Sequence, residues 1–394
     1  MVSVTDYTAN VKEKVMLVEK QKDIIFASGR IDSQNHEEFK KELFELATDD
    51  SVNVDAEELE YISSAGLRVF LQLGKLGKKI NIRNVNEEVY AIFDMTGFTE
   101  MFSIQKKLRN ISTDGLKKIG EGQTGAVYRI NDEQIIKVFN NTVAYDLICR
   151  EREIAKRALV AGVPTCISFE VVEVDDRYGI IYELVNSDTL EEIIAKNPKD
   201  DLYIKKYVDL LKDIHKINFA EYSLDKGPSL LTRYIGAAES LKDKLFTAEE
   251  VVKIQSIFKQ IGESDTFIHG DAHPGNIMVQ DGELLFIDMT TSGCGSYMLD
   301  MVTVASHLST WRKIRTDEEY IAEYGYTKED AVVLWDKFLS YYFETEDKEF
   351  KSSIEKKLDA INAFKYILGA AHSSDEKMKS RVPVYVEMVR LAIN

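Results

Sequence analysis

The feature of this sequence that most constrains its fold is a set of polar residues placed between two short apolar segments. Residues 267–268 lead into a loop with Asp271 and Asn276, and the apolar residues 284–287 end directly at Asp288. Short apolar runs of this kind predict buried strands, which would hold the two acids and the amide in place. Asp271 can accept a proton from an attacking hydroxyl, and Asn276 and Asp288 can hold the Mg²⁺ ions that bridge nucleotide phosphates. The segment therefore predicts phosphoryl transfer from ATP.

A glycine-rich loop lies far upstream, in the order that this chemistry needs. Gly120, Gly122 and Gly125 form the pattern Gly-x-Gly-x-x-Gly, in which the backbone can approach phosphates and offer its N–H groups. Dinucleotide-binding folds share the pattern, but there it joins a strand to a helix. Here residues 126–130 alternate like a strand, and a second strand is expected at 134–139. Strand–loop–strand is typical of kinases, so we expect ATP phosphates at this loop; an ordinary Gly-rich hairpin is the alternative.

The second of these strands carries Lys137 among apolar residues. A lysine there is costly unless its charge is paired, and in kinases its partners are ATP phosphates and a glutamate on the next helix. Glu151 shares a helix face with apolar residues, whereas Glu153 shares one with charged residues, so we expect Glu151 to be the partner. The alternative is an edge-strand lysine whose amine reaches water. The backbone from Glu183 to Val185 is expected to join two lobes and to hydrogen-bond adenine.

The segment around Asp271 also resembles a known family. Its polar positions match the motif of the aminoglycoside phosphotransferase and choline kinase group: His269, Gly270, Asp271, His273, Asn276, Asp288 and, more loosely, Asp300. Protein kinases instead place Arg where this chain has Gly270. A metal hydrolase that uses His269, Asp271 and His273 is the alternative, but no further cluster of histidines follows to complete a zinc site.

This resemblance covers about residues 114–394. It implies a protein kinase-like fold with an N-lobe at 114–185 and a C-lobe at 186–394 that ends in a helical substrate region. It also implies ATP and Mg²⁺ as cofactors and a hydroxyl of a small molecule as the acceptor. Matched position by position, it implies a catalytic base, two metal ligands and a phosphate-binding lysine: Asp271, Asn276 with Asp288, and Lys137.

The first part of the chain has a different pattern of short strands and helices. Residues 15–18 and 24–27 are expected to form a hairpin, and 52–55 a further strand. Apolar residues at helical spacing predict a buried helix over 65–77, and another strand is expected at 79–85. We therefore expect an α+β protein in which an α/β domain at the N-terminus precedes the two lobes.

This first part resembles the STAS domain of anti-sigma factor antagonists and sulfate transporters. Three segments match its motifs: residues 29–32, Asp55 with 61–67, and 93–98. The resemblance spans about residues 4–108, and we expect a STAS-like domain at 1–108. It implies a regulatory or partner-binding role, with phosphorylation at Ser64, where a phosphate would lie at the positive end of a helix. The residue before that serine is often Asp in the family and is Ser63 here, and both serines could simply cap the helix.

Composition narrows the class of protein. The formal charge of −17 argues against nucleic-acid binding, which depends on an excess of Lys and Arg. No apolar run is long enough to span a membrane, and residues 1–6 lack the features of a signal peptide. Cys149, Cys166 and Cys294 have neither metal nor redox spacing, so we expect a cytoplasmic protein.

Three functions follow from these patterns. The first is an ATP- and Mg²⁺-dependent kinase of a small-molecule hydroxyl with a regulatory STAS domain. The second is a signalling kinase that phosphorylates a STAS serine, its own Ser64 or a partner's, in a partner switch. The third is a module that binds ATP without catalysis. Residues 317–359 hold 13 acids and 6 bases among aromatic residues, which suits a cationic substrate, although an acidic surface over an aromatic core is the alternative.

Overall fold

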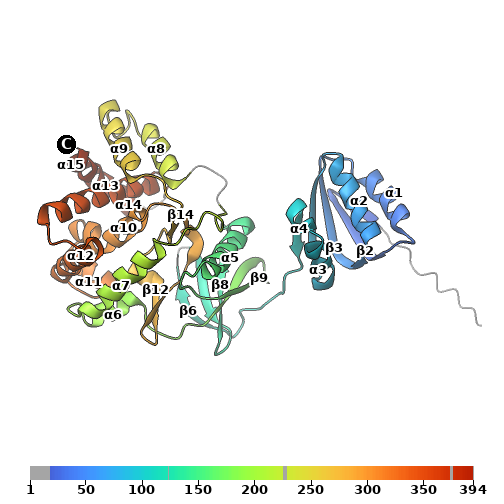
Figure 1. Cartoon of the computed structure of the whole chain (residues 1–394), viewed down its shortest axis with the longest axis horizontal. Coiled ribbons are helices and arrows are strands. Elements are labelled where there is room, and N and C mark those ends of the chain that lie inside the picture. The colour runs from blue at the N-terminus through green and yellow to red at the C-terminus, as the bar shows by residue number, and fades with distance from the viewer. Residues whose placement is uncertain (1–17, 123, 225–228, 373–375, 394) are drawn as a thin grey trace, which may run out of the picture. The chain divides into compact units, whose positions relative to one another are not determined.

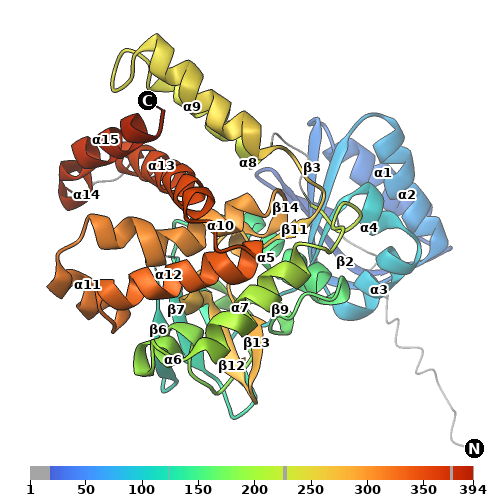
Figure 2. The ribbon, with the colours of Figure 1, turned by 60° about the vertical axis from the view of Figure 1, so that its left-hand side comes forward.

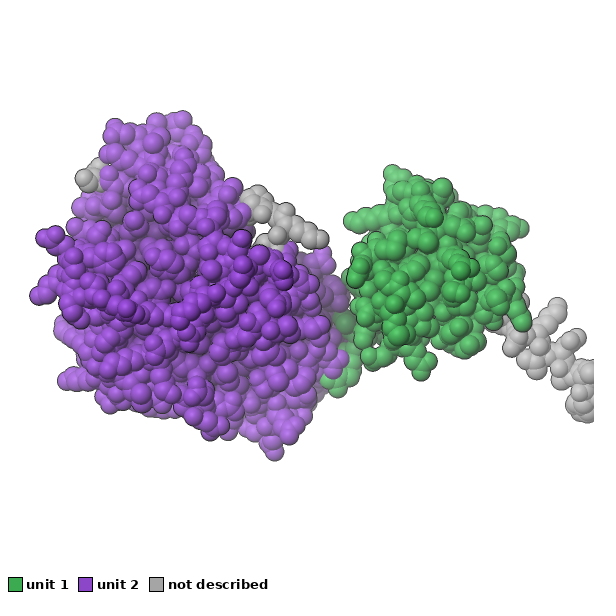
Figure 3. Space-filling view, viewed as in Figure 1, with its two compact units in different colours: residues 1–110 green, residues 111–394 purple. Residues whose placement is uncertain are grey.

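The computed structural model divides the chain into two compact units, residues 1–110 and 111–394 (Figure 3). The structure describes four stretches of the chain: 18–122, 124–224, 229–372 and 376–393. Most of the expected strand at 15–18 lies outside these stretches, as does Gln123 of the glycine-rich loop.

The first unit is built on one sheet with the strand order β1-β2-β3-β4-β5 (Figure 1). β1 and β2 form an antiparallel hairpin, as expected, and β2 to β5 run parallel to one another. Between the strands lie helices, of which α1 and α2 pack side by side. The elements are β1 (Val18–Gln21), β2 (Ile24–Ile31), α1 (His36–Leu46), β3 (Ser51–Ile62), α2 (Ser64–Lys75), β4 (Lys79–Val85), α3 (Glu87–Met95), α4 (Phe98–Met101) and β5 (Ser103–Lys106).

Helix α2 begins one residue before the predicted start at 65 and ends at Lys75, two residues before the predicted end. Ser63 caps the helix, because its side-chain oxygen accepts a hydrogen bond from the N–H of Gly66 at 3.4 Å. Gly66 is buried against β2 and β3, where an added Cβ atom would lie 2.5 Å from Ile31 Cγ2. Ser64 is the first residue of the helix and is exposed. Its hydroxyl is therefore open to solvent at the helix N-terminus.

The second unit begins with an antiparallel sheet in the order β6-β7-β8-β10-β9, and α5 packs against its last two strands (Figure 1). The strands on either side of the glycine-rich loop, β6 and β7, pair with each other, so the loop joins strand to strand as a kinase requires. The elements are β6 (Lys117–Glu121), β7 (Gly125–Arg129), β8 (Gln134–Phe139), α5 (Tyr145–Val160), β9 (Ser168–Val174) and β10 (Arg177–Glu183).

The rest of the second unit is largely helical, and its apolar residues form a single large core. Helix α9 lies beside α15, which in turn packs on α13 (Figure 2). No helix in the described part of the chain is long and apolar enough to cross a membrane. The helices are α6 (Leu190–Lys196), α7 (Asp201–Ile214), α8 (Leu230–Ser240), α9 (Ala248–Ile261), α10 (Met298–Ala305), α11 (Asp317–Tyr324), α12 (Lys328–Phe343), α13 (Lys348–His372), α14 (Glu376–Ser380) and α15 (Val382–Ile393).

Short strands and turns complete this part and carry the predicted catalytic residues. The strands form two small antiparallel pairs, β11 with β14 and β12 with β13. Their bounds, with those of the single-turn helices between them, are β11 (Phe267–Ile268), η1 (Pro274–Asn276), β12 (Ile277–Gln280), β13 (Glu283–Phe286), η2 (Met289–Thr291) and β14 (Gly293–Cys294). The fold is thus α+β, with a STAS-like α/β unit followed by a kinase-like unit and a helical C-terminal region.

Candidate active site

The loop that carries Asp271 leaves β11 and turns sharply at Gly270. Gly270 has φ +80°, and a Cβ atom at this position would lie 2.5 Å from the carbonyl oxygen of Thr291. Only glycine fits such a close approach of two backbones. The side chain of Asp271 that follows is 49% exposed. A rigid backbone thus presents a carboxylate that an outside molecule can reach.

Asn276 lies against this carboxylate. Its Nδ2 atom lies 2.9 Å from the carbonyl oxygen of Asp271 and 3.2 Å from Asp271 Oδ2. The single-turn helix η1 sets this geometry, and His273 caps it by accepting the N–H of Gly275 at 3.1 Å. Because Nδ2 faces Asp271, the side-chain oxygen of Asn276 is the atom left for a metal ion.

Asp288 follows the β12–β13 hairpin and has the unusual φ of 59°. Its Oδ2 lies 3.2 Å from the amine of Lys137, which comes from β8 in the five-stranded sheet of the unit. Burial by itself would raise the pKa of Asp288, but the charge and the hydrogen bond of Lys137 outweigh it, so this pKa is lowered. Asp288 is therefore a carboxylate at neutral pH, as a metal ligand must be.

Lys137 also pairs with the helix that follows its strand. Its amine lies 2.9 Å from Glu151 Oε1, and the side chain of Glu151 is 2% exposed. Glu153 instead pairs with Arg157 at 2.7 Å, in a partly exposed position. The structure thus brings Lys137 together with Glu151 and not with Glu153. The hydroxyl of Tyr182 donates a second hydrogen bond to Glu151 Oε1 at 2.8 Å.

The glycines of the loop differ in their surroundings. A Cβ atom on Gly125 would lie 2.1 Å from the carbonyl oxygen of Val138, so β7 and β8 leave no room for a side chain there. A Cβ atom on Gly122 would meet nothing within 4 Å, so there is room beside this residue, and its N–H donates to the carbonyl oxygen of Gly125 at 2.8 Å. Gly120 is nearly as open, with Val127 at 3.7 Å from its added Cβ.

Glu183 and Val185 lie where the sheet ends and the chain passes to the helical part. Glu183 is the last residue of β10, and its side-chain Oε1 accepts the N–H of Ile167 at 2.8 Å. Between them, Leu184 donates its N–H to the carbonyl of Glu133 at 2.7 Å. The side chain of Val185 is buried. These contacts hold the connecting segment in place.

Helix α10 supports the Asp271 loop through Asp300, which is fully buried. Its two carboxylate oxygens accept the backbone N–H groups of His269 at 2.9 Å and Gly270 at 2.6 Å. His215 Nε2 lies 3.1 Å from the same carboxylate. Burial would raise the pKa of Asp300, but the hydrogen bond and charge of His215 outweigh it, so this pKa is lowered. The sequence marked Asp300 through the family motif, but it assigned no role to Asp300 or to His215.

Thr290 was not identified from the sequence. Its hydroxyl donates to Glu151 Oε2 at 2.6 Å and also lies against Asp288 Oδ1. It therefore links the two carboxylates that flank Lys137. The only signal in the sequence was its place two residues after Asp288, where protein kinases have Gly and no side-chain hydroxyl.

Three partly buried titratable groups lie near the Asp271 loop: Glu191, His273 and His307. The rings of His273 and His307 stack with centroids 4.4 Å apart, and Glu191 Oε1 lies 3.8 Å from His307 Nε2. Burial lowers the pKa values of both histidines. Burial also raises the pKa of Glu191 to about 7, and the charges of Glu323 and Glu192 add to this rise. Glu191 is thus close to half-protonated at neutral pH.

The donor atoms at this site suit Mg²⁺. Asn276 and Asp288 offer the hard oxygen ligands that Mg²⁺ prefers, and one or two protein ligands are usual because water and phosphates supply the rest. A zinc site would need three or four protein ligands. Among the described residues, no group of three or more His, Cys, Asp or Glu could hold a metal ion. His269 is buried, and its Nε2 lies 3.0 Å from the carbonyl oxygen of Ile287, so it braces the loop instead.

Comparisons with known proteins agree with this fold. Residues 115–335 match the model of the phosphotransferase enzyme family, APH, and residues 18–106 match the model of the Mlab STAS domain. No curated protein sequence matches the chain significantly.

Similar solved structures include a choline/ethanolamine kinase family protein from Mesorhizobium loti. It is 14% identical with a TM-score of 0.46, and the match covers 71% of this chain and 88% of that protein. Another is the ADP-bound aminoglycoside phosphotransferase APH(2'')-Ib, at 17% identity and a TM-score of 0.48, and the match covers 77% of this chain and 99% of that protein. A third is the amicoumacin kinase hAmiN, at 10% identity and a TM-score of 0.47, and the match covers 76% of this chain and 92% of that protein.

These structural similarities are low, and the family is shown by the sequence match, which takes in more than half of the 394 residues. The chain therefore belongs to the phosphotransferase enzyme family and carries a STAS domain ahead of the part that matches this family.

Proposed function

We propose that this phosphotransferase uses ATP and Mg²⁺ to phosphorylate a hydroxyl of a small molecule, and that the STAS domain regulates it or binds a protein partner. The observation that carries the proposal is the arrangement around Lys137. Its amine is paired with both Glu151 and Asp288, and Asp271 lies beside Asn276 on the neighbouring loop. These are the positions that bind phosphates, metal and acceptor in a kinase.

The roles follow from charge and exposure. Asp271 is half-exposed and held by Asn276, so it can orient the acceptor hydroxyl and take its proton. The hydroxyl oxygen then forms a bond to the γ-phosphorus, and the bond from that phosphorus to the β–γ bridging oxygen of ATP breaks, which leaves ADP. Asn276 and Asp288 would hold Mg²⁺, which when bound neutralises charge on the phosphates. The loop at Gly120 and Gly122, which has room beside both residues, would lie over those phosphates.

The acceptor is proposed only as a hydroxyl compound. Composition suggested a cationic substrate, but many acids of residues 317–359 already have cationic partners. The ion pairs are Asp317–Lys328, Glu319–Arg381, Glu323–Arg315, Asp336–Lys351, Glu355–Arg312 and Asp359–Lys313. The aromatic residues of this region are largely in the core, with Trp335 2% exposed. An acidic surface over an aromatic core therefore accounts for most of this composition.

A second candidate function is phosphorylation of a STAS serine in a partner switch. It is favoured by the exposure of Ser64 at the N-terminus of α2, because a kinase can reach such a hydroxyl and the helix end would stabilise the phosphate. The side-chain oxygen of Ser63, by contrast, caps the helix by accepting the N–H of Gly66.

One experiment separates these functions. The full-length protein is incubated with γ-labelled ATP and Mg²⁺, first alone and then with a panel of hydroxyl compounds that includes amines, sugars and hydroxy acids. Label that appears on a small molecule and disappears in Asp271→Asn supports the first function. Label that appears on the chain and disappears in Ser64→Ala supports the second. Binding of ATP with no transfer under any condition contradicts both and indicates a module that binds nucleotide without catalysis.

A further inference from the structure

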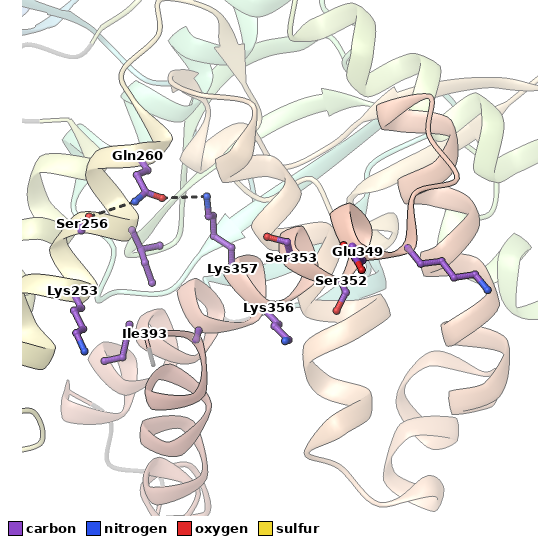
Figure 4. A pocket seen from close by; sticks show the side chains of 12 residues that line it. Lys253, Ser256, Gln260, Glu349, Ser352, Ser353, Lys356, Lys357 and Ile393 are labelled. Carbon is purple, nitrogen blue, oxygen red and sulfur yellow. Dashed lines mark hydrogen bonds between the residues drawn. The ribbon is translucent and has the colours of Figure 1, made fainter.

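A pocket of the second unit lies among helices and contains none of the residues of the candidate active site. It has a volume of about 660 Å³ and opens between α9, the first half of α13 and the end of α15 (Figure 4). Pockets of this size commonly hold small molecules. We call it the lysine pocket. It is lined by Lys253, Ser256, Ile257, Gln260, Lys348, Glu349, Ser352, Ser353, Lys356, Lys357, Ala392 and Ile393.

The charge of this pocket is opposite to that of the chain. Four lysines and one glutamate line it, whereas the whole chain carries a formal charge of −17. Three serine hydroxyls stand among the lysines. Ammonium and hydroxyl groups are hydrogen-bond donors, and phosphate oxygens are strong acceptors for them. The lining therefore suits an anion.

The lysines of the pocket also differ in their pairing from other lysines of the same region. Lys351 of the same helix pairs with Asp336 at 2.5 Å, and Lys328 of α12 pairs with Asp317 at 2.9 Å. Within the described part of the chain, Lys348 and Lys356 have no carboxylate partner within 4 Å. Two cations that share one pocket without counterions repel each other, and a bound anion would remove that repulsion.

The other two lysines of the pocket, Lys357 and Lys253, make only weak hydrogen bonds or ion pairs. Lys357 donates to Gln260 Oε1 over 3.4 Å, and Gln260 donates to Ser256 Oγ over 3.4 Å, so this chain of contacts spans from α13 to α9 (Figure 4). Lys253 pairs with Glu249 at 3.2 Å in an exposed position. Both interactions are weak at such lengths and exposures, and a ligand can replace them.

We infer that the lysine pocket binds a small molecule that carries two or more phosphate groups. Several phosphates are needed because the two lysines without a carboxylate partner, Lys348 and Lys356, lie eight positions apart on α13, which is about 12 Å along the helix axis. One phosphate would therefore meet only some of the lysines. A compact ligand is required because the strongly negative chain around the pocket would repel a long polyanion such as nucleic acid. This site is separate from the candidate active site, and the inference does not depend on the proposed function.

The test uses inositol hexakisphosphate as the probe, because its ring of six phosphates places few demands on the spacing of the lysines. The full-length protein is titrated with the probe in a calorimeter without Mg²⁺. We expect saturable binding that weakens as salt is added, and at least a tenfold loss of affinity in Lys348→Ala/Lys356→Ala. Since neither lysine has an ion pair among the described residues, the double variant should keep its fold, which its thermal unfolding would verify.

A matched control removes the same charge elsewhere. Lys216 and Lys242 pair locally with Asp213 and Glu239, and neither lines the pocket. Lys216→Ala/Lys242→Ala should bind the probe as the native chain does. A fluorescent ADP analogue in a parallel titration reports whether the probe enters the nucleotide site instead. Failure of the native chain to bind the probe, equal affinity in the lysine pocket variant, or an equal loss in the control would overturn the inference.

Discussion

The hydroxyl of Thr290 donates a hydrogen bond to Glu151 Oε2 over 2.6 Å, although 139 positions separate the two residues in the chain. The same hydroxyl lies against Asp288 Oδ1, but it has only one hydrogen to donate. Thr290 therefore ties helix α5 to the segment that carries the expected metal ligand, and it sits between the two carboxylates that share Lys137.

Removing this hydroxyl should loosen the site. In Thr290→Val, Glu151 Oε2 stays buried and loses its donor, which typically costs about 1–3 kcal/mol. We expect the free energy of unfolding to fall by that amount in urea denaturation and the affinity for Mg²⁺·ATP to fall with it. Thr290→Ser keeps the hydroxyl and should restore most of both quantities. A Thr290→Val protein as stable as the native chain, or a Thr290→Ser protein that loses as much stability as Thr290→Val, would contradict this role of the hydroxyl.

Asp300 should be needed to hold the Asp271 loop. In the native chain, two backbone N–H groups donate to the carboxylate oxygens of Asp300. In Asp300→Asn, the amide NH₂ replaces one of these oxygens, so one of the two N–H groups loses its acceptor. Because these groups are buried, we expect a loss of about 3 kcal/mol or more in the free energy of unfolding. Thr303 supports the same loop by accepting the N–H of Ala272 at 3.0 Å, and Thr303→Val should cost less because no charge is removed. A stable Asp300→Asn protein with native unfolding would contradict this role.

Asp300 also predicts how stability changes in acid. Its pKa is lowered in the folded chain, so its contribution is fully present above the unfolded pKa of about 3.9 and is lost as the pH falls from there toward the folded pKa. The free energy of unfolding should therefore decline below about pH 4. Asp300→Asn should show a smaller decline over the same range, in urea titrations at several pH values.

Glu191 should make the free energy of unfolding change with pH in the opposite direction, and nearer to neutral pH. Its pKa is raised to about 7 in the folded chain, so the folded state holds a proton that the unfolded state has lost above about pH 4.5. Stability should fall as the pH rises from 4.5 to 7. Glu191→Gln removes this penalty, and we expect it to raise the free energy of unfolding at pH 8 by about 1–3 kcal/mol.

The control for Glu191 is Glu318→Gln, which makes the same change of charge at an exposed position. It should leave the pH profile of stability unchanged. If the Glu191→Gln profile also matches that of the native chain, the buried carboxyl does not hold its proton at neutral pH.

The glycine-rich loop offers a matched pair of substitutions. Gly125→Ala forces a Cβ atom to within 2.1 Å of the Val138 carbonyl, so the pairing of β7 with β8 must shift. Gly122→Ala meets no atom within 4 Å. We expect Gly125→Ala to lower the melting temperature by several degrees, since small domains lose roughly 2–8 °C for each kcal/mol. Gly122→Ala should unfold as the native chain does, and any effect it has should appear in nucleotide affinity.

Much of the fold was predictable because its patterns are local. The strand expected at 134–139 is β8 with the same bounds, and its short apolar run was sufficient evidence. The strand expected at 52–55 was too short a prediction, because β3 continues to Ile62. Its second half is rich in glutamate, which disfavours strands, and its parallel pairing with β2 overrides that preference. Pairing of this kind cannot be inferred from the segment itself.

The candidate site likewise has a part that the sequence predicts and a part that it does not. Motif spacing singled out the residues that face the expected ligand, because each position is set by a short strand and loop. The supporting contacts of Thr290, Tyr182 and His215 were missed, since each depends on the packing of elements that are distant in the sequence. A threonine, a tyrosine or a histidine carries no signal of such a contact by itself.

The anchoring of the Asp271 loop by Asp300 has a consequence for how the enzyme is made. The chain is synthesised from its N-terminus, so Gly270 leaves the ribosome 30 residues before the carboxylate that will accept its N–H. Until α10 has emerged and docked, the loop has two backbone donors with no protein acceptor. The candidate active site is therefore among the later parts of the nascent protein to mature, and a shortened translation product that ended between Asp288 and Asp300 would lack the carboxylate that holds the Asp271 loop.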